Sequence, residues 1–494
     1  MGHAPRAVEP IGAGASVAPD MLREAKPMAE SPKSAAVGVV LRRNYLSALE
    51  NLAQSIGTMG PVATIGTVLP LLIYKSGNGT WLLFLGIMAS FCLISTSINV
   101  FASRFASAGS LSAFAETGLG KGAGSLTGWS YIVAMAFVVI SSGVSSAYYL
   151  SMVLTHFTRR PVEMPGSVLL TVLVILAAWW PAYRDIKLST KIMLAVESLS
   201  VVAILFILGA AMFRSHHWVD RAQLTLDGAS FPGIRLGFVL AFMTLAGFES
   251  TTTLGEEART ATHTLPRVMF LCIIPIGILF VGSIYCLTAL SHSQNLALDQ
   301  SDAPLDMIAQ SIGLPTLGWL SSLGVAVSCF GCALGGFNAG ARVIFSMARS
   351  RHLWRYFEGV HPVNGTPSRA LALLGGLSLA VSCAMIGLGV RMSDAMDYLM
   401  QIASLGFLGG YLAVCAAAPA FLARKHKLGM GRLVIAAAAM AVIGAAFFLS
   451  LFPVPDGPWR YLPYIFVGLL VAGMMLSWRL QSGLPGAAEP SAVE

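Results

Sequence analysis

Two acidic residues lie deep inside apolar stretches of this sequence. Glu249 occurs in LAGFESTTTL, and Glu197 occurs in KIMLAVESLSVV. Placing a charged side chain at the centre of a lipid-spanning helix costs roughly 2.5–3.5 kcal/mol, so such residues usually face a protein interior and have a function. A carboxyl buried in this way can hold a proton or bind a cation. For each residue the alternative is a structural carboxyl that is hydrogen-bonded to a neighbouring helix.

A second group of charged residues lies where apolar stretches end. Two acids and a basic residue occur in LGEEART, and a further arginine follows in NAGAR. We expect these residues to form a gate of ion pairs near one face of the molecule, which breaks and re-forms during function. The alternative is ordinary surface charge at helix ends. The gate residues are Glu256, Glu257, Arg259 and Arg342.

The remaining reactive residues give no sign of a catalytic or metal-binding cluster. The nine histidines all lie in loops, tails or the ends of apolar stretches, and none occurs in an H-E-x-x-H pattern. Cys329 and Cys332 have C-x-x-C spacing, but no second pair or nearby histidine supports a metal, so we expect two packing residues. No glycine loop of Walker type occurs. The sequence therefore predicts a protein that is not an enzyme and that needs no metal or cofactor.

The elements that position these residues must be membrane-spanning helices. The chain has 494 residues, of which 56% are hydrophobic and 11% charged, and its mean hydropathy is +0.73. A soluble domain carries about a quarter charged residues. Apolar stretches of about 20 residues, the length that crosses a bilayer, recur along the chain. We predict about twelve spans, at 46–74, 81–103, 122–154, 167–183, 188–213, 233–256, 267–290, 313–347, 368–390, 396–422, 431–452 and 460–479.

Basic residues indicate how these spans are oriented. With the N-terminus inside, the inner loops and span ends carry roughly twice as many lysines and arginines as the outer ones. We therefore expect both termini in the cytoplasm, and we assign the net charge of +8 to topology and not to binding of nucleic acid. Residues 1–40 and 481–494 are predicted to be disordered tails on either side of a membrane domain at 41–480.

Two of the predicted spans are interrupted. The first contains SIGTMGP at 55–61, where two glycines and a proline disfavour a continuous helix. The sixth contains LAGFES, whose glycine is followed by the polar run Ser250 to Thr253. Interrupted helices at matching positions of two halves are typical of transporters built as inverted repeats, which bind substrate near the middle of the bilayer.

Three segments resemble a known family, the amino acid–polyamine–organocation superfamily. AFMTLAGFESTTTLGEEART, 241–260, resembles its sixth-helix signature. NAGARVIFSMARSRHLWRYFEGVHPVNGTPSRAL, 338–371, resembles the end of its eighth helix with the following inner loop. AGSLSAFAETGLGKGAGSLTGW, 108–129, is similar to the start of its third helix. The first break matches more loosely, since Gly-Thr-Met-Gly replaces the more common Gly-Ser-Gly.

The resemblance covers roughly residues 43–480 and implies an all-α integral membrane protein of the leucine-transporter type. In that fold the first five helices, here 46–213, and the next five, here 233–422, form an inverted repeat. Two extra helices, here 431–479, follow them.

The resemblance also implies where a substrate binds. In the family the broken first helix holds a substrate carboxylate through free N–H groups, and the broken sixth helix offers carbonyls to the amino group. For the two glycines of the first helix the alternative is close helix packing. These roles fall on Ile56, Gly57, Thr58, Met59 and Gly60 in the first helix, and on Ala246, Gly247 and Phe248 in the sixth, with Phe242 as a further aromatic against the substrate.

Four residues are candidates for coupling or gating. In relatives the position of Glu249 gates the substrate or senses protons, and Glu197 is a second candidate. Some proton-coupled relatives carry a lysine in the fifth helix where a sodium ion would otherwise sit, and an ungapped count places Ser200 at that position. Ser200 and Ser328 are therefore candidate sodium ligands, and both proton and sodium stay open as the coupling ion.

The sequence thus predicts a secondary transporter, or permease, of the plasma (inner) membrane that moves an amino acid by alternating access. Proton-coupled import is the expected mode. A carrier of amines or polyamines and an amino acid exchanger of the same fold are alternatives, and a channel or membrane-embedded enzyme is an alternative of another class. The expected partners are an amino acid, a proton or sodium ion, and the lipid bilayer.

Overall fold

The described part of the chain is helical apart from short connections. In this computed structural model it comprises residues 1–2, 40–229, 231–298, 301, 303–452, 454 and 457–482. The predicted tails 1–40 and 481–494 lie almost wholly outside these ranges. One isolated β-bridge joins Leu46 to Ala258.

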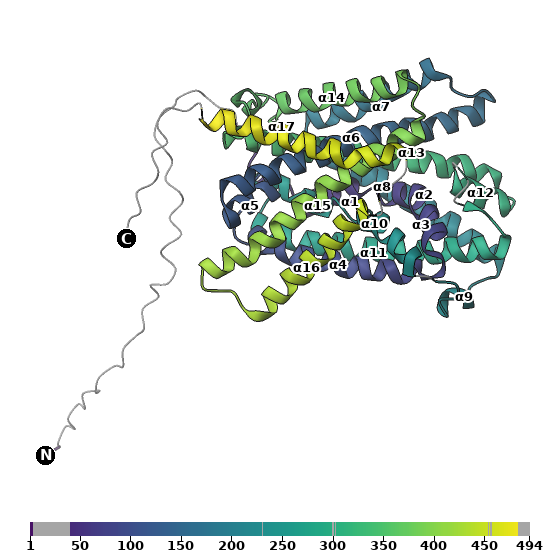
Figure 1. Ribbon diagram of the computed structural model, residues 1–494, viewed down its shortest axis with the longest axis horizontal. Coiled ribbons are helices and arrows are strands. Elements are labelled where there is room, and N and C mark those ends of the chain that lie inside the picture. The colour runs from purple at the N-terminus through teal and green to yellow at the C-terminus, as the bar shows by residue number, and fades with distance from the viewer. Residues whose placement is uncertain are drawn as a thin grey trace. The chain divides into compact units, whose positions relative to one another are not determined.

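Long helices form the body of the membrane domain (Figure 1). They are α4 (Thr80–Ala102), α6 (Lys121–Thr158), α7 (Met164–Arg184), α8 (Ile186–Ser215), α11 (Ala261–Gln294), α13 (Pro315–Arg349), α14 (Ser368–Gly387), α15 (Met392–Arg424), α16 (Met430–Leu451) and α17 (Leu462–Ser482). Shorter elements connect or interrupt them: α1 (Ala48–Met59), α2 (Pro61–Thr67), α3 (Leu69–Ser76), η2 (Gly77–Gly79), α5 (Leu111–Leu119), α9 (Arg221–Leu224), α10 (Phe231–Met243), η3 (Phe248–Leu254), α12 (Pro304–Ser311), η5 (Arg355–Glu358) and η6 (Gly457–Tyr461).

Eleven helical segments within the described ranges are long and apolar enough to cross a membrane, which confirms the predicted class of fold. The predicted number was about twelve. The difference arises at the first predicted span, because it is divided into α1 and α2, of 12 and 7 residues, which are each too short to cross.

Both predicted breaks are present in the structure. Helix α1 ends at Met59, and Gly60 adopts a left-handed conformation with φ of 53° before Pro61 begins α2. Helix α10 ends at Met243, and Gly247 is also left-handed, with φ of 97°, before η3 begins. Glycine adopts this conformation without the steric cost that other residues carry, so the two glycines fix where the chain changes direction.

Helices of the first predicted half pack in pairs against helices of the second. Helix α4 packs on α11, α7 on α14 and α6 on α13, so each helix meets the one five predicted spans later. Helix α6, the third predicted span, also packs on α15, the tenth. The corresponding pair, α13 as the eighth span and α8 as the fifth, is in contact too. A short helix precedes each of the two longest ones, and Figure 1 shows these short helices, α5 and α12, at opposite ends of the domain.

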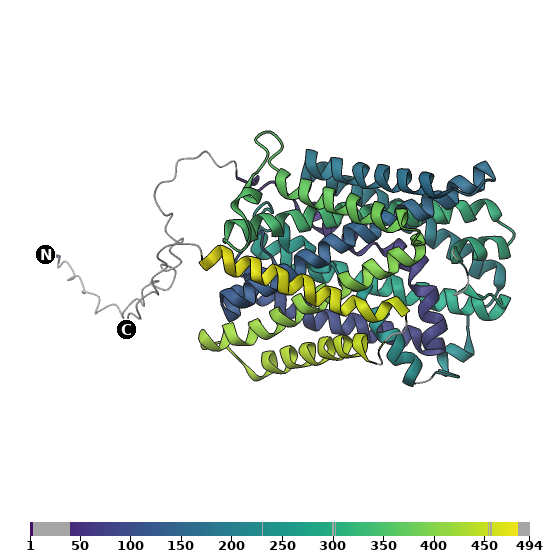
Figure 2. The ribbon, with the colours of Figure 1, turned by 45° about the horizontal axis from the view of Figure 1, so that its top comes forward.

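Small residues allow the central helices to approach closely. Gly336 and Gly340 of α13 face Met135 and its neighbours on α6, and Gly128 of α6 lies against Met347 of α13. The last two helices, α16 and α17, lie along one side of the domain beside α15 (Figure 2). The two broken helices thus lie among the first ten predicted spans, and the last two spans lie at one side of them.

Replacement of Gly60 by alanine should destabilise the fold. A left-handed conformation costs other residues about 1–2 kcal/mol, and a Cβ at this position would also collide with the Cys332 sulfur. Gly86→Ala in α4 is the matched control, since nothing lies within 4 Å of its Cβ and alanine favours a helix. We expect a lower Tm for Gly60→Ala in detergent and an equal or higher Tm for Gly86→Ala. Equal effects of the two changes would contradict this account of the break.

Candidate substrate cavity

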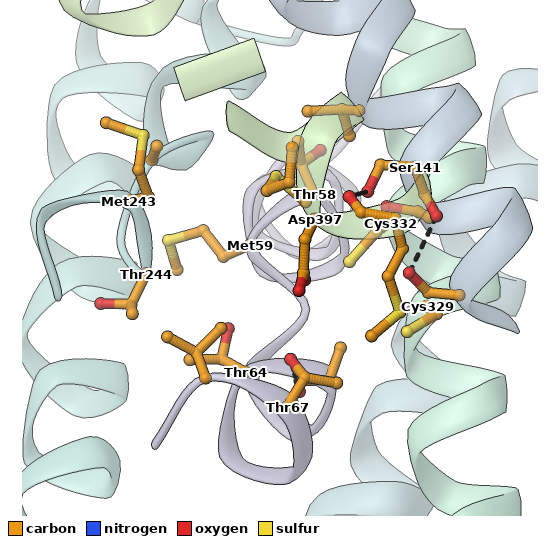
Figure 3. Close-up of a pocket in the computed structure, with 18 of the residues that line it drawn as sticks. Thr58, Met59, Thr64, Thr67, Ser141, Met243, Thr244, Cys329, Cys332 and Asp397 are labelled. Atoms are coloured by element: carbon orange, nitrogen blue, oxygen red, sulfur yellow. Dashed lines mark hydrogen bonds between the residues drawn. The ribbon is translucent and has the colours of Figure 1, made fainter. Parts of the chain in front are cut away.

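A cavity lies between the two broken helices (Figure 3). Its volume of about 120 Å³ is several times the roughly 10–15 Å³ that one water molecule requires. The lining comes from α2, α6, α10, α13 and α15 and from both breaks. It comprises Thr58, Met59, Ala63, Thr64, Thr67, Val68, Val138, Ser141, Ser142, Ser145, Leu240, Met243, Thr244, Ala246, Cys329, Cys332, Met396, Asp397, Met400 and Phe407.

Three of the predicted substrate residues, Thr58, Met59 and Ala246, line this cavity. Gly57 does not, because it packs against α8, where a Cβ on Gly57 would lie 3.1 Å from the Met193 Cβ. Ile56 is partly buried and packs against the hydrophobic core. Gly60 and Gly247 supply the bends beside the cavity without belonging to its lining.

The free backbone groups at the first break differ from those predicted. Helix α1 continues through Met59, and the Gly60 N–H donates to the Ile56 carbonyl at 3.0 Å, so the N–H groups of residues 57–60 are not exposed. The carbonyls of Gly57, Thr58 and Met59 have no donor among the described residues, because Pro61 has no N–H and the next helix starts anew. The break therefore offers carbonyl oxygens where free N–H groups were expected.

The two predicted aromatic residues lie behind the break and not against the cavity. Phe242 and Phe248 are fully buried in a cluster with Phe91 and Tyr411. The ring centroid of Phe91 lies 4.9 Å from that of Phe242 and 5.5 Å from that of Phe248. The ring centroids of Phe248 and Tyr411 are 5.8 Å apart. Such packing stabilises the bend in the sixth span, so these rings support the site from outside.

Glu197 is joined to the first broken helix by a chain of hydrogen bonds. The Ala63 N–H, in the first turn of α2, donates to Ser328 Oγ at 3.0 Å. Ser328 Oγ in turn donates to Glu197 Oε1 at 2.8 Å. The other carboxyl oxygen of Glu197 is buried and has no partner among the described residues. A carboxyl on the fifth span is thus linked to α2 through one hydroxyl.

Ser200, the position that the ungapped count assigned, lies on α8 beside Gly324 of α13. Its Cβ lies 4.0 Å from a Cβ built on Gly324, about one helical turn from Ser328 along α13, and no hydrogen bond joins the two serines. The structure therefore places Glu197 at the junction of α2, α8 and α13. The role of Ser200 and Ser328 as sodium ligands stays a prediction.

Glu249 takes part in a similar chain at the second break. The Gly247 N–H donates to the Tyr411 hydroxyl at 3.2 Å, and that hydroxyl donates to Glu249 Oε2 at 2.5 Å. Here too the second carboxyl oxygen is buried without a partner in the described chain. Glu249 is fully buried and does not line the cavity, so it contacts α15 and not a substrate.

Beyond the cavity, a buried polar network fastens α1 to its neighbours. Ser250 Oγ donates to Thr58 Oγ1 at 3.1 Å, and Ser55 Oγ donates to the Phe248 carbonyl at 2.7 Å. Asn338 on α13 donates to Gln54 Oε1 at 3.1 Å. These bonds hold the first half of the first span against the second half of the sixth.

The predicted gate residues lie at the end of the domain beyond this network, which we call the closed end. Arg342 and Glu257 form an ion pair in which each side chain is only 1% exposed, and Arg342 Nη2 lies 3.0 Å from Glu257 Oε1. The backbone N–H groups of Tyr45 and Leu46 donate to the Glu257 carbonyl at 2.7 and 2.9 Å. Glu257 thus pairs with Arg342 through its side chain and holds the segment that leads into α1 through its backbone carbonyl.

The other two gate residues lie at the same end. Glu256 pairs with Arg349, and Arg259 Nε donates to the Asn44 carbonyl at 3.1 Å. Burial raises the pKa of the Glu256 carboxyl, but the hydrogen bonds and charge of Arg349 outweigh burial and hold that pKa below its ordinary value. The pair therefore stays ionised at neutral pH and weakens only in acid.

Comparison with known proteins decides the family. The family model described as amino acid permease matches residues 50–478. The chain belongs to the amino acid permease family. This agrees with the superfamily that the three sequence segments resemble.

Relatives of this permease are themselves transporters by name. An uncharacterised transporter of Mycobacterium tuberculosis is 25% identical over 69% of this chain and 74% of its own length. The D-serine/D-alanine/glycine transporter of Escherichia coli strain K12 is 23% identical over 66% of this chain and 71% of its own. A vacuolar cationic amino acid transporter of Arabidopsis thaliana is 23% identical over 63% of this chain and 52% of its own.

Sequence reasoning missed most of the polar lining of the cavity. The serines of SSGVSS in α6 and the threonines of α2 supply hydroxyls, and Asp397 supplies a carboxylate. The polar run SSGVSS in an apolar span was a usable signal, because its serines recur on one helical face. Asp397 lies at the start of the predicted tenth span, where an acid is indistinguishable from an ordinary helix-end charge.

Removal of one partner from the buried gate pair should strongly destabilise this permease. Glu257→Gln leaves Arg342 buried without a counter-charge, which costs about 3–5 kcal/mol. We expect a large fall in Tm. Glu358→Gln is the matched control, since its pair with Arg355 is exposed and such pairs contribute little. Arg342→Met combined with Glu257→Gln should recover part of the loss, and a double variant as unstable as the sum of the two single changes would contradict the pairing.

Proposed function

We propose that this permease is a secondary transporter that carries an amino acid or a related amine by alternating access, with a proton bound at Glu197 as the coupling ion. The observation that carries the proposal is the cavity between two broken helices, sealed at one end by buried ion pairs. Inverted-repeat transporters bind their substrates at such breaks. The names of the relatives support this class of substrate, although each named substrate belongs to that relative.

Alternating access requires that the closed end can open. Helix α1 joins α2 through the left-handed Gly60, and η3 with the segment after it joins α10 through the left-handed Gly247. Hinges are a few residues that absorb large changes of backbone angle, and these two positions fit that role. Opening would break the Glu257–Arg342 pair and the hydrogen bonds from Tyr45 and Leu46.

The direction of transport follows from the distribution of basic residues. In the predicted orientation, with both termini in the cytoplasm of a cell with an inner membrane, the closed end faces inward. The cavity is lined by residues from the outer halves of α6 and α15 in that orientation, such as Ser145 and Met396. This conformation would then receive substrate from outside, as proton-coupled import requires.

Glu197 is the better of the two coupling candidates. Its hydrogen-bond chain begins at Ala63, which itself lines the cavity, whereas no member of the Glu249 chain does. An ionised Glu197 would be a buried charge without a counter-charge, and such a charge is costly, so a proton would neutralise it. A shift of α2 would break the bond between Ala63 and Ser328 and alter the environment of the carboxyl.

Transport by liposomes that contain the purified protein tests this proposal. We expect saturable uptake of labelled amino acids or amines, stimulated by an inward proton gradient and not by a sodium gradient. Glu197→Gln should abolish accumulation driven by the gradient and retain exchange of substrate between the two sides, because glutamine cannot carry the proton. Glu163→Gln, at an exposed glutamate before α7, should behave as the wild type.

Three results would count against parts of the proposal. Stimulation by sodium, unaffected in Glu197→Gln, would remove the proton from the mechanism. Loss of proton drive in Glu249→Gln but not in Glu197→Gln would assign coupling to the sixth span. Absence of saturable uptake for every amino acid and amine offered would overturn the transporter assignment itself.

A further inference from the structure

A carboxylate without a partner lies in the candidate substrate cavity. Asp397, on the second turn of α15, is exposed and lines the cavity, and it has no hydrogen bond or ion pair within the described chain. Figure 3 shows its side chain extending between Met59 and Cys329 toward Thr64 and Thr67 of α2. The neighbouring acid one turn earlier, Asp394, is by contrast paired with Arg391 at 2.9 Å.

The hydroxyl groups around this carboxylate mostly present oxygen lone pairs to a ligand. A hydroxyl has a single hydrogen to donate, and five of the seven hydroxyl side chains in the lining donate theirs to backbone carbonyls at 2.6–2.9 Å. What remains on each except Thr58 is acceptor capacity, because Thr58 Oγ1 already accepts from Gln54 Nε2 and Ser250 Oγ. These five residues are Thr58, Thr67, Ser141, Ser145 and Thr244.

The backbone at the first break adds to the excess of acceptors. The carbonyls of Thr58 and Met59 lack donors, as described above, and both residues line the cavity. Among the N–H groups there, that of Gly60 is bonded to Ile56 and that of Ala63 to Ser328, which leaves the Val62 N–H. No lysine, arginine or histidine occurs in the lining given above.

We propose that the substrate carries a net positive charge and that Asp397 selects it by binding its ammonium or guanidinium group. These groups are charged and donate hydrogen bonds without accepting any, so they match a lining of one free carboxylate and many acceptors. A neutral amino acid offers only its α-ammonium to these acceptors, whereas a basic amino acid or a diamine offers a second cationic group as well. The substrate class is therefore basic amino acids and their decarboxylated amines. This inference rests on the proposed function, since it assumes that the cavity binds the transported molecule.

Competition by matched compounds in the liposome assay tests the inference. Lysine, norleucine and 1,5-diaminopentane share a chain length, but norleucine lacks the second amine and the diamine lacks the carboxylate. We expect lysine and the diamine to be carried and to compete with each other, and norleucine to compete at least tenfold less well. Asp397→Asn should raise KM for the cationic compounds at least tenfold and should reduce the preference over norleucine. Asp394→Asn, one turn away and outside the lining, is the matched control.

Each outcome decides a separate point. Saturable uptake of norleucine with an affinity equal to that of lysine would overturn the inference and leave the proposed function standing. Equal loss of affinity for lysine and norleucine in Asp397→Asn would show a structural role for the carboxylate and would also overturn it. No saturable uptake of any of the three compounds, or of other amino acids, would overturn both. A thermal unfolding curve for Asp397→Asn with an unchanged Tm ensures that a loss of uptake is not a loss of fold.

Discussion

The need to satisfy backbone polar groups inside a membrane is the constraint on which the site depends. Lipid offers no hydrogen bonds, so a helix can be interrupted there only where the freed groups meet protein or water. At the first break the Ala63 N–H is taken up by Ser328, and at the second the Gly247 N–H is taken up by Tyr411. Two of the carbonyls freed at the first break belong to Thr58 and Met59, which line the cavity, where a bound ligand or water can satisfy them.

A backbone N–H freed at each of the two breaks is hydrogen-bonded in the same way. A backbone N–H beside the break donates to a hydroxyl, and the hydroxyl donates to a buried glutamate. The first chain joins the first, eighth and fifth spans through Ser328 and Glu197. The second joins the sixth and tenth spans through Tyr411 and Glu249. Only the first chain starts at a residue of the cavity lining, which is why two similar carboxyls would differ in function.

Features that depend on residue type could be predicted from the sequence, and features that depend on helix rotation could not. Pro61 and Gly60 fix the first break whatever the surroundings are, and Glu257 pairs with Arg342, although Glu256 pairs with Arg349 outside the predicted set. The direction in which a side chain points depends on the rotation of its helix, which packing sets. Phe242, expected against the substrate, is therefore buried against Phe91 outside the cavity lining, and Asp397 was missed because α15 begins at Met392, earlier than the predicted span.

Helix α2 is the element through which substrate and proton would influence each other. It supplies Thr64 and Thr67 to the cavity opposite Asp397, and its first turn supplies the N–H of Ala63 that leads to Glu197. A helix of 7 residues with a glycine hinge at its start can move as a small rigid body. A cation drawn between Asp397 and α2 would bias the position of this helix, and that position determines whether the hydrogen bond to Ser328 forms. Reciprocity of coupling then requires that protonation of Glu197 changes the affinity for substrate by the same factor.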